Sequence, residues 1–525
     1  MEKPYRDVLC DVALRATEYL QLIQERPVRP SQQAIDDLME LGGPLPEHGQ
    51  DARTVIKLLD EKGSPGTVAT QGGRFFGFVV GGALPATVAA HWLADAWDQN
   101  ACLYELSPVA VQCEDIVLPW LVDLLRLPNG CGGAFVTGAQ MANFTALAAA
   151  RHATLMDANW NVEDDGLFGA PPITVVVGEE VHVTVLKALA MLGLGRNRIV
   201  IIPTDAQGRM RADALPRLSG PAIVCVQVGN VNTGACDPVG AICDAAHQQR
   251  AWVHVDGAFG LWAATAPTRC HLTEGVSAAD SWATDAHKWL NVPQDSGIAI
   301  VRNKRHLRDA MAITASYLHP GERREPMQNG PESSRRARAV EIWAALRNLG
   351  RQGVADLVER TCQHAMRFAD RLRSAGFEIL NEVVLNQVLV SFGEPDTTKR
   401  IIDAIQRDGT CWCSGTIWKG RTAMRISVSS WATTDTDVDR SLDAILRIAK
   451  REAAYSHERI DRLLATIHNK KMKALAISIA HAACEHPHPH DRCSWKHFLL
   501  RIFFLSLVES PALGSADECQ LIAKQ

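Results

Sequence analysis

The chain has 525 residues, of which 47% are hydrophobic and 22% are charged, and its formal net charge at pH 7 is −5. This composition is that of an ordinary globular protein and excludes a disordered or strongly basic chain. The mildly acidic balance gives no reason to expect nucleic acid or an anionic membrane surface as a partner.

The first 65 or so residues predict helices, because apolar residues recur at helical spacing in DVALRATEYLQLI (11–23) and SQQAIDDLMEL (31–41). A third helix is predicted in DARTVIKLLDEKG (51–63), where the final glycine is expected to end it. The Gly-rich, aromatic stretch GGRFFGFVVGGALPA (72–86) then predicts a loop that lets another group approach closely. Helical patterns follow from Pro85 to Arg126.

From Gly132 onward, short β-branched runs alternate with helical stretches. After the run that begins at Gly132, strands are predicted at 173–177, 198–203, 222–228, 251–256 and 297–301. Buried strands that alternate with helices indicate an α/β fold with a mostly parallel sheet covered on both faces. Ligands of such sheets bind at the carboxyl ends of the strands.

The pattern changes after Pro320. A polar stretch leads into a long helical segment, then into the strand-like runs FEILNE, QVLVSF and AMRISVSS, and finally into a capped helix that begins near residue 434. This pattern predicts a smaller α+β unit. We therefore expect four parts: an N-terminal helical arm (1–75), a large domain (76–320), a small C-terminal domain (321–455) and an extension (456–525).

The extension has no clear periodicity. It contains ACEHPHPHDRC, with potential metal ligands at Cys484, His486, His488, His490 and Cys493. A metal site and a disordered tail are both open, and the alternating prolines favour the tail, so no metal is expected.

Several features indicate a cytoplasmic protein. The N-terminus is charged and amphipathic, which predicts neither a signal peptide nor a membrane span. The apolar stretch HFLLRIFFLSLV near the C-terminus is too short to cross a bilayer. The 14 cysteines are scattered, as expected of free thiols in a reducing compartment.

Lys288 lies in the mostly apolar stretch SWATDAHKWLNVPQDSG (281–297). A lysine is seldom fully buried without compensation, and one form of compensation is a covalent Schiff base. Asp256 ends the predicted strand of WVHVDGAFGLW (252–262), where a ligand is expected to bind. A lysine for an aldehyde and a carboxylate for a protonated pyridine nitrogen are the pair that pyridoxal phosphate requires. A surface lysine and a helix N-cap are the alternative interpretations of Lys288 and Asp256.

Two further segments fit the same cofactor. Thr137, Gly138 and Ala139 connect a predicted strand to an Ala-rich helix, whose first backbone N–H groups can bind a phosphate. His182 follows a predicted strand, where a neutral imidazole can stack on a flat ring. A simple tight turn and a capping or core histidine are the alternatives.

The segments TGAQMANFTALAAAR, GEEVH, DGAFG and DAHKWL occur in this order. Together they resemble the group II pyridoxal phosphate-dependent amino acid decarboxylases, which include aromatic-L-amino-acid, glutamate, tyrosine and diaminobutyrate enzymes. The resemblance covers about residues 70 to 450. It implies a fold-type I, transferase-like large domain, pyridoxal 5′-phosphate as cofactor, and decarboxylation of an L-amino acid to an amine and carbon dioxide.

The resemblance assigns roles position by position. Lys288 is similar to the Schiff-base lysine, Asp256 to the partner of the pyridinium nitrogen, and His182 to the stacking histidine that also assists the chemistry. Ala258 is similar to the small residue under the ring, and Asn230 to a polar residue near the cofactor. The phosphate side is implied at Thr137, Gly138, Ala139, Gln140 and His287, with Gln140 departing from the usual Ser or Gly.

Other positions bear on the substrate and the reaction type. Tyr317, in ASYLHPGE, resembles a mobile-loop tyrosine that returns a proton to the substrate carbon, and its alternative is an anchor for a surface loop. Arg425 falls where the family holds the substrate carboxylate, and its alternative is an ordinary ion pair. Phe78 and Val80 are expected in the substrate pocket.

The resemblance also implies a homodimer, with N-terminal helices that wrap the partner and an active site at the interface. An aromatic or bulky L-amino acid is the favoured substrate, and glutamate and diaminobutyrate stay open. An aldehyde synthase or an aminotransferase on the same fold, and a catalytically silent binding protein, are the alternative functions.

Overall fold

The computed structural model describes residues 5–313 and 324–466. The chain divides into two compact units, residues 1–449 and residues 450–525. The elements that form the candidate site all belong to the first unit. Within the described ranges, no helix has both the length and the apolar character needed to span a bilayer.

The N-terminal segment is helical, as predicted. It contains α1 (Arg6–Leu22), α2 (Gln32–Asp37), a short 3-10 helix (Leu38–Leu41) and α3 (Ala52–Gly66). The expected end of α3 at Gly63 is wrong, because glycine permits a helix end without enforcing one, and the helix continues to Gly66. None of the residues of α1, α2 or α3 is buried, and apolar side chains such as those of Leu14 and Leu59 are exposed.

A seven-stranded sheet forms the centre of the large domain. Its strands are β1 (Gly132–Val136), β2 (Thr174–Gly178), β3 (Val200–Ile202), β4 (Ala222–Gln227), β5 (Trp252–Asp256), β6 (Ser281–Asp285) and β7 (Gly297–Val301). Their order is β1-β7-β6-β5-β4-β2-β3. β7 runs antiparallel to both of its neighbours, and the remaining pairs are parallel, which confirms the predicted mostly parallel sheet.

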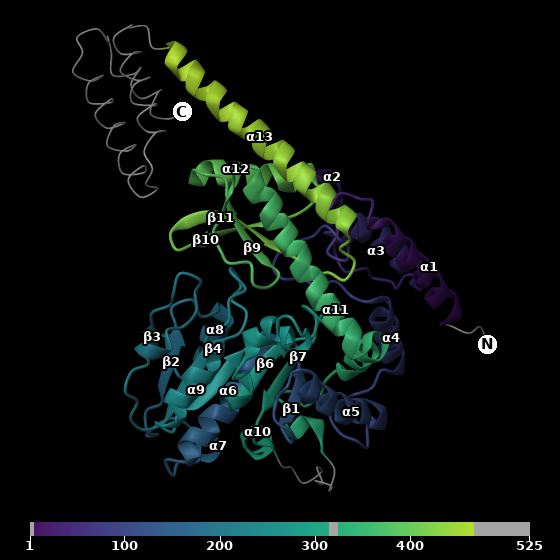
Figure 1. Cartoon of the computed structure of the whole chain (residues 1–525). Helices are drawn as coiled ribbons and strands as arrows, with labels where there is room; N and C mark the ends of the chain where they lie inside the picture. Colours follow the sequence, from purple (N-terminus) through teal and green to yellow (C-terminus); the bar gives the residue numbers. More distant parts are fainter. Residues whose placement is uncertain (1–4, 314–323, 467–525) are drawn as a thin grey trace. The chain divides into compact units, whose positions relative to one another are not determined.

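Helices cover both faces of this sheet (Figure 1). Alternate residues of β4 point to opposite sides: Ile223 and Cys225 join one hydrophobic cluster, and Val224 and Val226 join the other. The first cluster includes residues of α6 (Ala139–Met156), α8 (Val183–Met191) and α10 (Lys304–Met311). The second includes residues of α5 (Pro108–Leu124), α9 (Val239–His247) and the first part of α11 (Ala339–Ser374). The α-helices α4 (Pro85–Trp97) and α7 (Val162–Asp165) also belong to this part of the chain.

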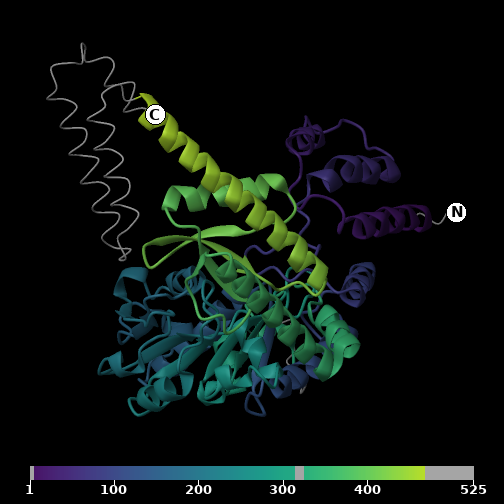
Figure 2. The same ribbon diagram turned by 45° about the horizontal axis from the view of Figure 1, so that its top comes forward.

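The smaller α+β unit is also present. A four-stranded antiparallel sheet has the order β10-β11-β9-β8 and consists of β8 (Glu378–Ile379), β9 (Gln387–Ser391), β10 (Ser414–Trp418) and β11 (Arg421–Ser427). The strands contact α12 (Pro395–Asp408) (Figure 2). α13 (Asp435–Thr466) crosses the predicted boundary at residue 455. The rest of the predicted extension, including its histidines and cysteines, lies outside the described residues.

Candidate active site

Asp256 and Lys288 follow neighbouring strands at the same edge of the sheet. Asp256 is the last residue of β5, and Lys288 follows β6 by three residues; the two strands pair in parallel, with Asp256 opposite Ala283. The two loops are joined directly, because the backbone N–H of Asp285 donates to the carbonyl of Ala258 over 2.9 Å. The structure therefore brings together the two residues on which the predicted cofactor depends.

Asp256 is buried, with 4% of its surface exposed. Its carboxylate accepts a hydrogen bond of 3.2 Å from the backbone N–H of Ala258. Burial raises the pKa of Asp256, and the nearby charges of His182 and Lys288 offset part of this rise. A carboxylate in this environment favours a cationic partner, such as a protonated ring nitrogen.

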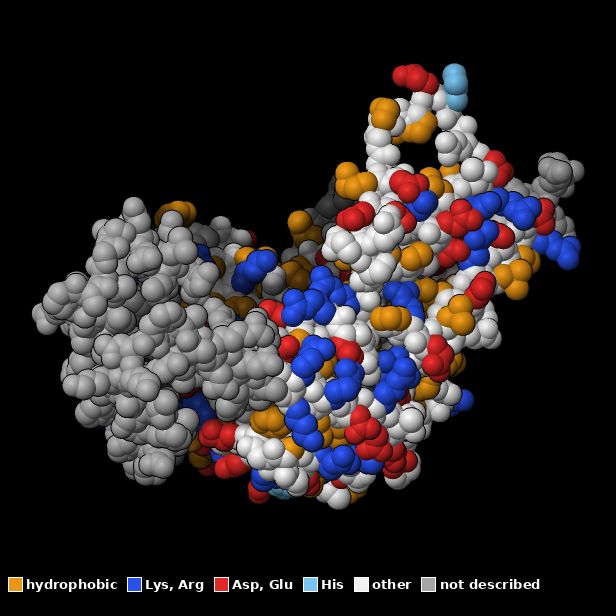
Figure 3. All heavy atoms as spheres, turned by 90° about the horizontal axis from the view of Figure 1, so that it is seen from above, with side chains coloured by type: hydrophobic (Ala, Val, Ile, Leu, Met, Phe, Trp, Pro, Cys, Tyr) orange, Lys and Arg blue, Asp and Glu red, His pale blue; other side chains and the backbone are white. Residues whose placement is uncertain are grey.

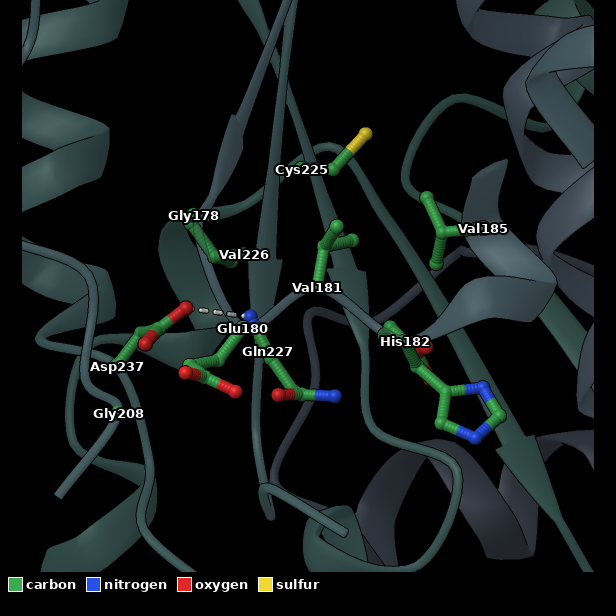
Figure 4. A pocket seen from close by; sticks show the side chains of 11 residues that line it. Gly178, Glu180, Val181, His182, Val185, Gly208, Cys225, Val226, Gln227 and Asp237 are labelled. Atoms are coloured by element: carbon green, nitrogen blue, oxygen red, sulfur yellow. Dashed lines mark hydrogen bonds between the residues drawn. The ribbon is translucent and has the colours of Figure 1, made fainter. Parts of the chain in front are cut away.

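His182 faces the same site from the start of α8. Its Nδ1 lies 2.7 Å from Oγ1 of Thr184 and accepts a longer bond from the N–H of that residue, so His182 also caps the helix. Burial lowers the pKa of His182 below its ordinary value, which leaves a neutral ring at neutral pH. A small cavity that includes His182, Gln227 and Asp256 in its lining lies beside it (Figure 4).

Lys288 is partly buried and has a carboxylate partner that the sequence analysis did not single out. Its Nζ lies 3.1 Å from Oδ2 of Asp285, and 21% of its side chain is exposed. The lysine is therefore not the isolated buried cation that the sequence analysis considered, because Asp285 compensates its charge. The signal was available, since Asp285 precedes Lys288 by three residues in the same short motif.

The turn that carries Lys288 is fixed from two sides. Asn291 donates hydrogen bonds to the carbonyls of Trp289 (2.8 Å) and Ser429 (3.0 Å). Gly81 packs against the turn so closely that a Cβ atom there would lie 1.7 Å from the carbonyl oxygen of Lys288. This contact confirms that the Gly-rich stretch permits a close approach.

The predicted phosphate-binding segment lies at the start of α6. Gly138 immediately precedes the helix, and Gly297 approaches it so closely that a Cβ at Gly297 would lie 2.4 Å from the Gly138 backbone. His287 is held beside it, because its Nδ1 accepts a 3.1 Å hydrogen bond from the N–H of Ser296. Thr137 and Gln140 flank the same position and are half-buried.

Arg425 lies on β11 of the smaller unit. Its guanidinium donates a 3.3 Å hydrogen bond to the carbonyl of Val231, while its Nε has no partner among the described residues. The residue is 8% exposed, and burial lowers its pKa. No ion pair of Arg425 is found within the described ranges, so this buried cation is suited to an anionic ligand.

The remaining predicted residues are Asn230, Phe78, Val80 and Tyr317. Asn230 is buried in its own loop: its Oδ1 accepts from the N–H groups of Asn232 and Thr233, and its Nδ2 donates to Gln227, which lines the cavity. Phe78 is 62% exposed and stacks on Trp412 at 5.4 Å. Val80 is half-buried. Tyr317 lies outside the described residues.

These residues fit pyridoxal phosphate on structural grounds. Asp256 offers a buried acceptor for the ring nitrogen, Lys288 an amine for the aldehyde, and α6 an N-terminus for the phosphate. The hydroxyl of Ser296, whose backbone N–H donates to His287, is buried and has no hydrogen-bond partner in the described part of the chain. Such an orphaned hydroxyl is consistent with a polar ligand at this position.

Comparison with known proteins supports the same assignment. The chain is 27% identical to tryptophan decarboxylase 1 of Oryza sativa subsp. japonica over 79% of this chain and 87% of that protein. It is 30% identical to L-2,4-diaminobutyrate decarboxylase of Rhizobium meliloti (strain 1021) over 72% of this chain and 77% of that protein.

A solved structure has the same fold. It is that of the Oryza sativa enzyme TDC with PLP and tryptamine, which superposes with a TM-score of 0.78 at 24% identity and covers 86% of this chain and 98% of that one. The family model described as the pyridoxal-dependent decarboxylase conserved domain matches residues 38–393. The chain therefore belongs to the pyridoxal-dependent decarboxylase family.

Proposed function

We propose that this chain decarboxylates an aromatic or otherwise bulky L-amino acid, with pyridoxal phosphate bound as a Schiff base to Lys288. The observation that carries the proposal is the placement of Lys288 and Asp256 on loops joined by a backbone hydrogen bond, close enough to His182 for their charges to affect its pKa. When bound, pyridoxal phosphate supplies an electron-withdrawing ring that stabilises the charge left when carbon dioxide departs.

The protein side chains have separate tasks in this proposal. Asp256 holds the proton on the ring nitrogen, and buried Arg425 binds the substrate carboxylate. Nδ1 of His182 is engaged by Thr184, so its Nε2 remains to contact the cofactor or hold a proton. We assign the return of a proton to the substrate carbon to Tyr317, on the strength of the family resemblance.

The aromatic character of the loop at 72–86 supports the favoured substrate. Phe75 and Phe78 both stack on Trp412, at 5.0 and 5.4 Å between ring centroids, which places an aromatic group beside the loop that contacts Lys288. Diaminobutyrate is the second candidate, because a relative of that specificity reaches 30% identity. Glutamate decarboxylation and aldehyde synthase activity are alternatives that the experiment below separates, and an aminotransferase would release none of the three products that it measures.

We also propose a cytoplasmic homodimer. The uncovered apolar side chains of α1 and α3 support a partner subunit, and the cysteines of the described part are all free thiols, as expected in a reducing compartment. On the face seen in Figure 3, hydrophobic side chains lie in small separate groups among charged ones.

The function is tested by incubating the purified protein, loaded with pyridoxal phosphate, with a panel of L-amino acids. Carbon dioxide, ammonia and hydrogen peroxide are measured together. The proposal predicts carbon dioxide without ammonia or peroxide, at the highest rate for an aromatic or bulky substrate, and loss of the signal in Lys288→Ala. Formation of ammonia and hydrogen peroxide in amounts that match the carbon dioxide would instead identify an aldehyde synthase.

A further inference from the structure

Asp285 lies where two functional groups of the site meet. Its side chain is 3% exposed, its Oδ1 accepts a 2.5 Å hydrogen bond from the N–H of Ala139, and its Oδ2 pairs with Lys288 at 3.1 Å. Ala139 is the first residue of α6, an 18-residue helix. One carboxylate therefore binds both the N-terminus of this helix and the proposed Schiff-base lysine.

The cofactor phosphate requires the same helix N-terminus. The first N–H groups of a helix and the positive end of its dipole attract one anion strongly, and a second anion beside it is repelled. The carboxylate of Asp285 and a phosphate dianion thus compete for one site.

We propose that the carboxylate of Asp285 competes with the cofactor phosphate, a role that we call the counter-ion latch. The carboxylate pairs with Lys288 and accepts from the N–H of Ala139 until the phosphate displaces it. Because this displacement is needed, Asp285 weakens retention of the phosphorylated cofactor. The displaced carboxylate has a partner within reach, because Nε2 of His287 lies 3.7 Å from its Oδ1. Asp285 is a positioning residue here, and the inference rests on the proposed function, since it assumes the phosphate at α6.

The test compares two ligands that differ only in the phosphate group. Dissociation constants of pyridoxal 5′-phosphate and of pyridoxal are measured by equilibrium dialysis for the wild-type protein and for Asp285→Asn. Asparagine keeps an oxygen that can accept from Ala139 but carries no charge. Removing the charge of Asp285 changes the environment of Lys288 equally for both ligands. The ratio of the two dissociation constants therefore reports on the phosphate alone.

The latch predicts that the dissociation constant of pyridoxal divided by that of pyridoxal 5′-phosphate is higher in Asp285→Asn than in the wild-type protein, by about tenfold or more. An unchanged or smaller ratio would overturn it. Asp285→Ser, which also leaves a neutral helix-capping oxygen, should behave in the same way. If both neutral variants fail to fold even with the cofactor present, Asp285 has a structural role and the latch is wrong.

A matched control is Asp51→Asn, which removes a carboxylate from another helix N-terminus. Asp51 accepts a 3.1 Å bond from the N–H of Thr54 at the start of α3. The ratio should not change in this variant. If the wild-type protein binds neither ligand, the proposed function fails; if it binds the phosphorylated ligand and the ratio is unaffected by Asp285→Asn, only the latch fails.

Discussion

Arg425 is the residue whose environment points most directly to a substrate. It is a buried guanidinium without a carboxylate partner in the described part of the chain, and a charge-assisted pair with a ligand carboxylate would be strong there. Replacing it with methionine should raise KM for the amino acid about tenfold or more, while the affinity for pyridoxal phosphate stays within about twofold. Steady-state kinetics and equilibrium dialysis measure the two quantities.

Arg421 offers the matched control, because it lies on the same strand but pairs with Glu378 at the surface. Arg421→Met should leave KM unchanged. If Arg425→Met has a normal KM, or if both variants raise it equally, Arg425 does not bind the substrate carboxylate.

Asp237 is expected to make stability depend on pH. Burial raises its pKa to about 6, although it accepts hydrogen bonds from the N–H groups of Met210 and Gln227. Because the folded-state pKa is higher than the unfolded one, the folded state retains the proton, and the resulting stabilisation is present below pH 4 and lost as the pH rises to 6. The loss amounts to about 3 kcal/mol.

Urea unfolding of the wild-type protein and of Asp237→Asn between pH 4 and 7 measures this effect. Asparagine resembles the protonated carboxyl, so the wild-type protein should lose stability relative to the variant as the pH rises. Parallel pH profiles of the two proteins would contradict the shifted pKa of Asp237.

Single residues could be assigned from the sequence where the motif itself identifies them. Lys288, Asp256 and His182 follow predicted strands or motifs and meet at one sheet edge in the structure. The carboxylate partner Asp285 was missed, although its position three residues before Lys288 in the same motif made the pairing a possibility worth considering; only the fold of the turn shows that the two side chains meet.

At the scale of elements, the loop at 72–86 supports the lysine turn. A Cβ atom at Gly81 would overlap the carbonyl oxygen of Lys288, so Gly81→Ala must displace backbone on one side or the other. We expect a loss of about 1–3 kcal/mol in the free energy of unfolding, together with weaker binding of pyridoxal phosphate. Thermal unfolding and the visible absorbance of the bound cofactor report on the two effects.

Gly49→Ala is the control for this variant, because a Cβ atom at Gly49 would have no neighbour within 4 Å. It should match the wild-type protein in both measurements. Normal cofactor absorbance in Gly81→Ala would show that the close contact does not position Lys288.

Strands could be predicted from the sequence where their composition is typical of strands. β2, β4, β5 and β7 are rich in valine and isoleucine and were predicted, whereas β6 (SWATD) and β10 (SGTIW) were missed. β6 is recognisable as a strand only through its pairing with β5 and β7, and β10 begins with a serine and a glycine. Pairing between distant segments is not encoded in any local pattern.

At the scale of the whole molecule, the uncovered helices α1 and α3 predict a homodimer. Leu14 and Leu59 are exposed members of these helices, and a double replacement of both with aspartate should shift the protein towards a monomer. Sedimentation velocity over a range of concentrations measures the change. Phe168→Asp is the control, since Phe168 is fully exposed and lies outside both helices. A wild-type protein that sediments as a monomer would contradict the dimer.

The central claim is that Lys288 carries pyridoxal phosphate as a Schiff base. The most direct test is borohydride reduction of the protein in the presence of the cofactor, followed by proteolysis and mass spectrometry of the peptides. We expect the reduced cofactor to be attached to the peptide containing Lys288, and Asp256→Asn to weaken its retention. An unmodified Lys288, or attachment to a different lysine, would show that Lys288 does not carry the cofactor.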